Sequence, residues 1–227
     1  MNIKKTARIV GILYIIGTIA GTMSVRFLSA GNAQDYLVEI AKNPHSLLIG
    51  SLLELVMGFA LAMIPAFMFP VLKKYNEVLS LGYIIFRGAL ETFTYIVKVI
   101  CFLSLMSLSV EYVATGLQNV SYFQTLGMML KEIIDIPLTA FVFGAGALMF
   151  YTVLYKSMII PRWISGFGLV AIILHITSGV LVLLGLQENF DTVSLIMNLP
   201  IALQEMIMAV WFIVKGFRVV ETKPCFE

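Results

Sequence analysis

Hydrophobic positions in this chain form long unbroken runs, and a short polar segment separates each run from the next. Each run is close to the ~20 residues that an α-helix needs to cross about 30 Å of hydrocarbon. The six runs cover residues 9–28, 47–72, 79–108, 128–155, 163–184 and 193–214. Because they are continuously apolar rather than alternating, they predict helices and not the strands of a membrane barrel. We therefore expect an all-α polytopic membrane protein, a bundle of six transmembrane helices.

Two connecting segments have a mixed character. Residues 33–42 are polar, but Tyr36, Leu37 and Ile40 recur at the spacing of one helix face. A short helix of this kind lies in the plane of a membrane surface, so we expect an interfacial helix here. Residues 111–125 are expected at the interface as well. Together the spans and connections predict a single integral-membrane domain over residues 1–227.

The composition places the chain in lipid rather than in water. Hydrophobic residues make up 60% of it and charged residues only 12%, which is outside the range of soluble domains. The net charge of +2, without a basic patch that interleaves aromatic residues, gives no reason to expect nucleic-acid binding. The two cysteines, Cys101 inside an apolar run and Cys225 near the end, do not make a disulfide framework.

The distribution of Lys and Arg predicts the orientation. One set of loops and ends carries Lys4, Lys5, Arg8, Lys73, Lys74, Lys156, Arg162, Lys215, Arg218 and Lys223. The opposite set carries only Arg26 and Lys42. The positive-inside rule then places both termini in the cytoplasm. Trp163 and Trp211 stand near the cytoplasmic ends of their runs, as aromatic belt residues do.

The run 79–108 contains three charged side chains, Arg87, Glu91 and Lys98. A charge that faces lipid at the bilayer centre costs between ~3 and ~17 kcal/mol, so these side chains must face protein or water. At ~100° per residue, Glu91 lies about 40° and Lys98 about 20° around the helix from Arg87. All three therefore share one face, which predicts the inner wall of the bundle.

Other runs add charges to this interior. At ~1.5 Å per residue, Glu91, His175 and Glu205 lie within a few ångströms of the midplane. Glu54 and Asp135 are expected nearer the outer side. The arrangement predicts a polar cavity, and its candidate binding or proton-relay residues are Glu54, Arg87, Glu91, Lys98, Asp135, His175 and Glu205.

Three functions fit this set of residues. Carboxylates and a histidine can bind a small cationic solute or relay protons, which predicts a water-filled cavity. An ion-pair network that only fixes helix register in a membrane sensor or scaffold predicts a dry, fully paired core. An intramembrane enzyme that acts on lipid, with Glu or His as acid or base, predicts a lateral opening.

Catalytic and metal-binding signatures are missing from the sequence. It contains no HExxH, GxSxG, GxxxxGK[ST] or CxxC pattern, and only two histidines. We therefore expect no metal and no cofactor. Gly17 and Gly21 form a small-xxx-small pair that allows close helix packing, within the chain or in a homodimer. Six spans are compatible with a complete unit and with half of a dimer.

Three stretches of the sequence resemble a known family. They are ARIVGILYIIGTIAG at 7–21, LYKSMIIPRWISGFG at 154–168 and LPIALQEMIMAVWFIVKGF at 199–217. They are similar to the bacterial integral-membrane family called domain of unknown function 4386 (DUF4386). The resemblance implies a multi-span protein of the bacterial inner membrane without an established activity. It points to Arg87, Glu91, Pro161, Pro200 and Glu205 as positions to test, without giving them roles.

Overall fold

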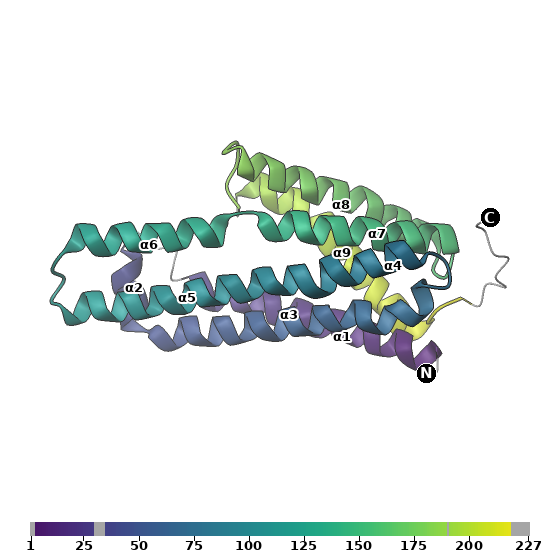
Figure 1. The fold of residues 1–227 in the computed structure, drawn as a ribbon, viewed down its shortest axis with the longest axis horizontal. Helices are drawn as coiled ribbons and strands as arrows, with labels where there is room; N and C mark the ends of the chain where they lie inside the picture. Colours follow the sequence, from purple (N-terminus) through teal and green to yellow (C-terminus); the bar gives the residue numbers. More distant parts are fainter. Residues whose placement is uncertain (1–2, 30–34, 190, 219–227) are drawn as a thin grey trace. The chain divides into compact units, whose positions relative to one another are not determined.

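The computed structural model describes residues 3–29, 35–189 and 191–218. Helices dominate this part of the chain and none of it forms a strand, which confirms the expected all-α class (Figure 1). Within the same residues, six helical segments are long and apolar enough to cross a membrane. They are Ile3–Leu28, Pro44–Leu72, Glu77–Ala114, Val120–Ser157, Arg162–Leu183 and Thr192–Val214. Residues 33 and 34 of the expected interfacial helix, together with Lys223 and Cys225, lie outside the described residues.

The chain divides into two compact units. Unit 1 contains Met1–Ile16, Phe59–Thr92 and Pro137–Glu227, and unit 2 contains Gly17–Gly58 and Phe93–Ile136. Three helices contribute residues to both units: α1 (Ile3–Leu28), α3 (Pro44–Leu72) and α5 (Glu91–Ala114). Each unit has its own core and its own polar side chains, and each is described separately below.

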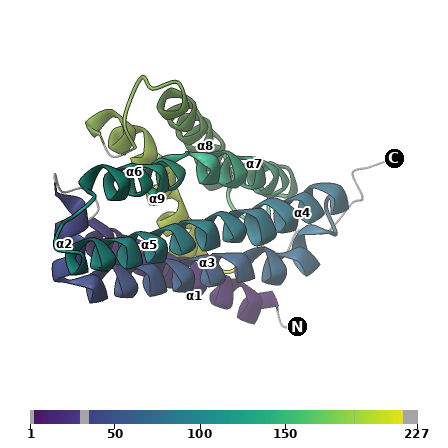
Figure 2. The same cartoon turned by 60° about the vertical axis from the view of Figure 1, so that its left-hand side comes forward.

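Unit 1 is built around three long helices: α7 (Leu138–Ser157), α8 (Arg162–Leu183) and α9 (Thr192–Val214). α7 packs against α8 and against the short helix α4 (Glu77–Tyr83), and α8 packs against α9. Figures 1 and 2 both show α8 running beside α7. Aromatic rings fill this core, and those of Tyr83 and Phe150 stack with centroids 4.5 Å apart. Such stacking adds to the stabilisation that their burial provides.

Small residues on α7 bring it close to the segment that follows α4. A Cβ atom added at Gly146 would lie 3.1 Å from the backbone nitrogen of Arg87. A Cβ atom at Gly144 would lie 2.5 Å from a side-chain carbon of Ile176 on α8. The stretch FGAGA at 143–147 therefore allows α7 to approach both neighbours closely, as small residues do in membrane bundles.

Unit 2 includes α2 (Tyr36–Lys42) and α6 (Val120–Asp135) together with parts of α1, α3 and α5. A short helix, α2, is present within the expected range, and its apolar face is covered by protein; its place at the membrane surface stays a prediction. The hydrophobic core cluster of unit 2 consists of Leu37, Ile40, Leu47, Leu105, Tyr112 and Phe123. Leu37 and Ile40 are 3% and 0% exposed within this cluster. Burial against other helices removes the same apolar area from water that insertion into lipid would remove.

The third and fourth helical segments are longer than the hydrophobic runs that predicted them. Glu77–Ala114 is continuous over 38 residues, about 57 Å at 1.5 Å per residue, whereas the hydrocarbon layer is about 30 Å thick. The helix continues past the run because Tyr112 is buried and its ring lies 5.1 Å from that of Phe123 on α6. Residues 111–125 therefore form the end of α5, a turn and the start of α6.

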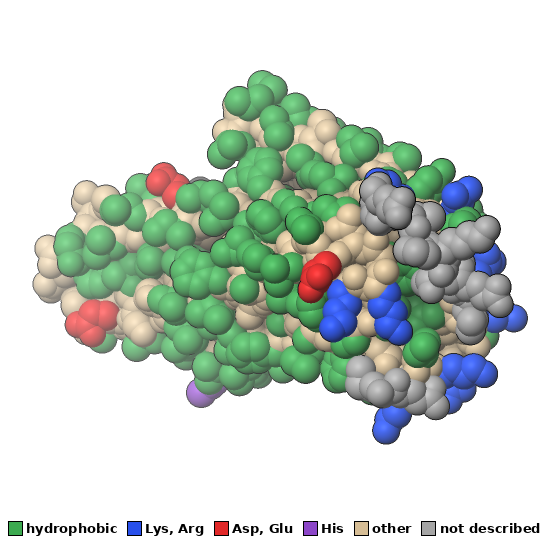
Figure 3. All heavy atoms as spheres, turned by 45° about the vertical axis from the view of Figure 1, so that its right-hand side comes forward, with side chains coloured by type: hydrophobic (Ala, Val, Ile, Leu, Met, Phe, Trp, Pro, Cys, Tyr) green, Lys and Arg blue, Asp and Glu red, His purple; other side chains and the backbone are tan. Residues whose placement is uncertain are grey.

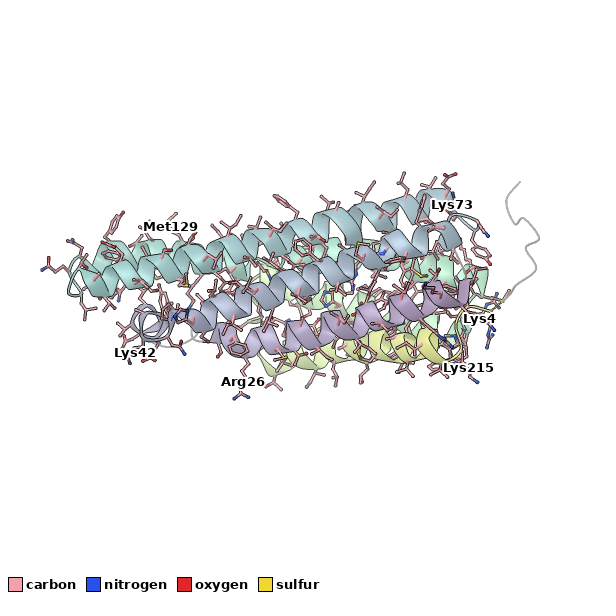
Figure 4. The ribbon with its side chains drawn as sticks, turned by 90° about the horizontal axis from the view of Figure 1, so that it is seen from below. Lys4, Arg26, Lys42, Lys73, Met129 and Lys215 are labelled. Carbon is pink, nitrogen blue, oxygen red and sulfur yellow. The ribbon has the colours of Figure 1, made fainter. Side chains whose placement is uncertain are left out.

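Basic residues collect at one end of unit 1. Lys4, Lys73 and Lys215 lie at the same end in Figure 4, although they come from α1, the turn after α3 and the end of α9. Figure 3 shows most Lys and Arg side chains on the drawn face gathered at one end, and hydrophobic side chains covering its flank. The predicted orientation depends on this gathering of basic residues at one end. The assignment of this end to the cytoplasm stays a prediction.

Candidate functional site

The centre of the candidate site in unit 1 is a π-helix, Ile84–Leu90, which contains Arg87. The backbone N–H of Glu91 donates to the carbonyl of Phe86, five residues earlier, instead of to the residue four earlier. Such wider turns are rare, and they occur frequently at functional sites. The helix returns to the α form at Glu91, so the π-helix separates α4 from α5.

Arg87 joins two carboxylates from different helices. Its Nη1 donates to both carboxylate oxygens of Glu91, at 2.9 and 3.0 Å. Its Nη2 donates to Oε1 of Glu205 on α9, at 2.9 Å. The guanidinium carbon also lies 4.3 Å from the centroid of the Phe143 ring on α7. The predicted pairing of Arg87 with Glu91 is present, and Glu205 belongs to the same cluster.

The three charged groups differ in exposure and do not balance. Arg87 is 3% exposed, Glu91 is 1% exposed and Glu205 is 16% exposed. When both carboxylates are ionised, the cluster has one positive and two negative charges. Among these three groups the net charge is then negative, so a proton or a cation bound beside the carboxylates would be attracted electrostatically. Glu205 is the carboxylate that such a charge reaches most readily.

Three buried tyrosines surround the cluster. Tyr14 on α1, Tyr83 on α4 and Tyr151 on α7 are each 1% exposed. Each of them interacts electrostatically with both Arg87 and Glu205. These tyrosines are not among the predicted site residues, because an aromatic residue within an apolar run is ordinarily part of the packing. Their hydroxyl groups make the surroundings of Glu205 more polar than the runs suggest.

A hydrogen-bonded chain extends from one of these tyrosines to α8. The hydroxyl of Tyr151 donates to Oε1 of Gln204 at 2.6 Å, and Nε2 of Gln204 donates to the carbonyl of Ile164 at 3.2 Å. Gln204 is 0% exposed and directly precedes Glu205. These bonds fix α9 against α7 and α8 at the level of the site.

Replacing Tyr151 by phenylalanine is expected to destabilise the protein by about 1–3 kcal/mol, because it leaves a buried amide oxygen of Gln204 without its donor. Thermal unfolding of the purified protein in detergent measures the change. Tyr155→Phe is the matched control, since Tyr155 is on the same helix but 41% exposed. Equal stability of both variants would contradict a role for this hydrogen bond.

His175 lies at the edge of the cluster rather than among its carboxylates. Its Nδ1 is 2.5 Å from Oδ1 of Asn198 on α9, and its ring meets that of Phe143 edge-on at 5.1 Å. Phe143 therefore contacts both His175 and Arg87. Nε2 of His175 is buried and has no hydrogen-bond partner among the described residues. Asn198 in turn donates to the carbonyl of Ser194 at 2.8 Å.

The remaining three candidate residues belong to unit 2. Glu54 is 8% exposed, accepts a hydrogen bond from Ser24 at 3.3 Å and interacts electrostatically with the half-buried Lys98. Asp135, which was predicted to face a polar interior, is exposed at the end of α6. The chain turns there at Pro137, whose missing N–H ends the helix ladder.

The described residues contain no group of three or more His, Cys, Asp or Glu side chains placed to hold a metal ion. In the Arg87 cluster, the guanidinium itself occupies the position between the two carboxylates. A carboxylate next to a fixed positive charge can exchange a proton or a small cation.

No curated protein and no solved structure matches this chain. A family model, Domain of unknown function (DUF4386), matches residues 9–216. The match reaches all six membrane-spanning segments and includes Arg87, Glu91 and Glu205. The chain is thus a multi-pass membrane protein that belongs to the DUF4386 family.

Proposed function

We propose that this protein moves a proton or a small cation through the membrane, and that Glu205 is the group that binds and releases it. The observation that carries the proposal is that one buried guanidinium donates to two carboxylates from different helices, and that Glu205 is the more exposed of the two. Carboxylates inside membrane spans commonly mark ion and proton pathways.

Glu91 and Glu205 have different roles in this proposal. Glu91 accepts two hydrogen bonds from Arg87 and is almost fully buried, so it acts as the permanent counter-ion. Glu205 accepts one hydrogen bond from Arg87, through Oε1, and part of its side chain is accessible. A proton on Glu205 weakens its charge-assisted bond to Arg87, because that bond depends on the negative charge.

Weakening of the bond between Arg87 and Glu205 loosens α9 from the π-helix. Both elements depart from regular α-helical hydrogen bonding: Arg87 is in the π-helix, and α9 contains Pro200, which lacks an N–H to donate. Proton binding thereby shifts the balance between a joined and a separated arrangement of these two elements. We further propose that this occurs in the cytoplasmic membrane, with both termini inside the cell.

A membrane scaffold is the competing function. It is favoured by the pairing of Arg87, whose two terminal nitrogens both donate to carboxylates while the ring of Phe143 covers the guanidinium. A purely structural network of this kind needs every partner for folding and exchanges nothing. Retention of the fold with loss of flux, on removal of Glu205 alone, separates the two functions.

Flux measurements on Glu205→Gln test the proposal. Purified protein is placed in vesicles that enclose a pH-sensitive dye, and an inward proton gradient is applied with the membrane potential clamped. Wild type is expected to acidify the vesicles faster than empty vesicles do, and Glu205→Gln is expected to match the empty vesicles. Glu188→Gln, which changes an exposed acid in a loop, is the control and keeps the wild-type rate.

Sodium and methylammonium uptake are measured in the same vesicles, because either cation can replace the proton at a carboxylate. The proposal is contradicted in two ways: Glu205→Gln carries protons or these cations as fast as wild type, or wild type carries none of them faster than empty vesicles.

A further inference from the structure

An apolar groove with a volume of about 500 Å³ opens on the surface of unit 1, formed by the start of α8 and the last turns of α9. Its lining consists of Trp163, Met206, Ile207, Val210, Trp211, Val214 and Lys215. From Met206 to Lys215 it follows α9 for roughly 13 Å at 1.5 Å per residue. The groove lies outside everything that the proposed function uses.

The groove and the Arg87 cluster lie on opposite faces of α9. Val214 is nine residues after Glu205, which places it about 180° around the helix at 100° per residue. The buried face of α9 carries Met208 and Phe212, both 0% exposed, while Val210 and Val214 are 56% and 67% exposed. The apolar residues of the groove therefore face outward, where a membrane supplies acyl chains.

One end of the groove is positively charged. Gly216 has a φ of +70°, and its N–H donates to the carbonyl of Trp211, so α9 ends at Val214 with Lys215 as its C-cap residue. The chain then turns back, and the N–H of Arg218 donates to the carbonyl of Ile159 at 2.8 Å. This turn places the guanidinium of Arg218 over the ring of Trp211, at 5.7 Å.

We propose that this groove binds an anionic phospholipid, with an acyl chain along Trp163, Val210 and Val214 and the phosphate between Lys215 and Arg218. Charge complementarity selects the headgroup, because basic side chains at the membrane surface attract anionic lipids. A zwitterionic lipid brings an ammonium group that the same two cations repel. Inorganic phosphate would satisfy the cations but leave the apolar length of the groove uncovered.

The two tryptophans of the chain provide the test, since both line the groove. The protein is placed in vesicles that contain brominated phosphatidylglycerol or brominated phosphatidylcholine at equal mole fraction, and quenching of tryptophan fluorescence is measured. Each cation is expected to favour the anionic lipid by about fivefold, and the pair by roughly thirtyfold. Trp163→Phe then reports on Trp211 alone.

Lys215→Gln with Arg218→Gln is expected to abolish this preference while quenching by the acyl chain continues. Lys73→Gln with Lys74→Gln is the matched control: it removes two cations from the same end of unit 1 that do not line the groove, and it keeps the preference. The proposal is overturned if both lipids quench wild type equally. It is also overturned if the preference for the anionic lipid survives in the Lys215 and Arg218 variant and is lost in the Lys73 and Lys74 variant. Quenching in the Lys215 and Arg218 variants also shows that their groove remains formed.

Discussion

Replacing Arg87 by glutamine is expected to lower the free energy of unfolding by about 3–5 kcal/mol, because buried Glu91 and half-buried Glu205 then both lose the guanidinium that donates to them. No other single substitution proposed for this protein removes a partner from two buried charges. The same change removes the guanidinium that covers the ring of Phe143. Thermal unfolding in detergent measures the loss, and Arg162→Gln is the control. Arg162 is exposed, so its replacement is expected to change stability by less than about 0.5 kcal/mol.

A triple variant separates the charge from the shape of the site. With Glu91→Gln and Glu205→Gln added to Arg87→Gln, no uncompensated charge remains, and much of the lost stability is expected to return. Stability of Arg87→Gln within about 1 kcal/mol of wild type would contradict the cluster as described, since a buried charge without a partner costs more than that.

Adding side chains at Gly11 gives the second large effect. A Cβ atom there would lie 2.6 Å from the backbone oxygen of Ala209 on α9, and a backbone oxygen cannot rotate away. Gly11→Ala is expected to cost about 1–3 kcal/mol, and the still larger Gly11→Leu is expected to cost more. Unfolding by heat in detergent gives both values.

Gly166→Ala is the matched control for Gly11→Ala. Its Cβ atom would lie 3.6 Å from the nearest atom, a ring carbon of Tyr155, which is an ordinary contact. Alanine is the better residue inside a helix by about 0.5–1 kcal/mol, so this variant is expected to be slightly more stable than wild type. Destabilisation by both variants would show that helix contacts do not distinguish these glycines.

The sequence was sufficient to find the six spans, and its seven candidate residues included the three that form the charged cluster. Charge within an apolar run is so costly in lipid that Arg87, Glu91 and Glu205 had to face the protein interior wherever the helices packed. The pairing of Arg87 with Glu91 followed from their separation by four residues, and the structure has it. Residue type and spacing determine these features, and both can be read from a single chain.

The rotation of each helix could not be obtained in the same way. Depth along the membrane placed His175 beside the carboxylates, but its ring pairs with Asn198 and contacts Phe143. The angles calculated for the third run assumed 100° per residue throughout, and the π-helix around Arg87 breaks that assumption. Asp135 is the last residue of α6, and Pro137 two residues later interrupts the fourth run, so one helix phase does not extend through it.

Contacts between side chains of different helices were the other feature that the sequence did not predict. The tyrosines around Glu205 come from α1, α4 and α7, and no pattern within one run connects Tyr14 with Tyr83 and Tyr151. The length of α5 depends on Tyr112, which is buried only because Phe123 on the next helix covers it. Contacts of this kind depend on tertiary structure, which overrides local hydropathy.

Infrared difference spectroscopy of the purified protein tests the central claim most directly, because the C=O stretching band of a carboxylic acid is visible only when the group holds a proton. Spectra are taken between mildly alkaline and mildly acidic solution for wild type, Glu91→Gln and Glu205→Gln. We predict one band that appears on acidification in wild type and in Glu91→Gln, and that is missing in Glu205→Gln. A band that persists in Glu205→Gln, or no band in wild type, would contradict Glu205 as the exchanging group.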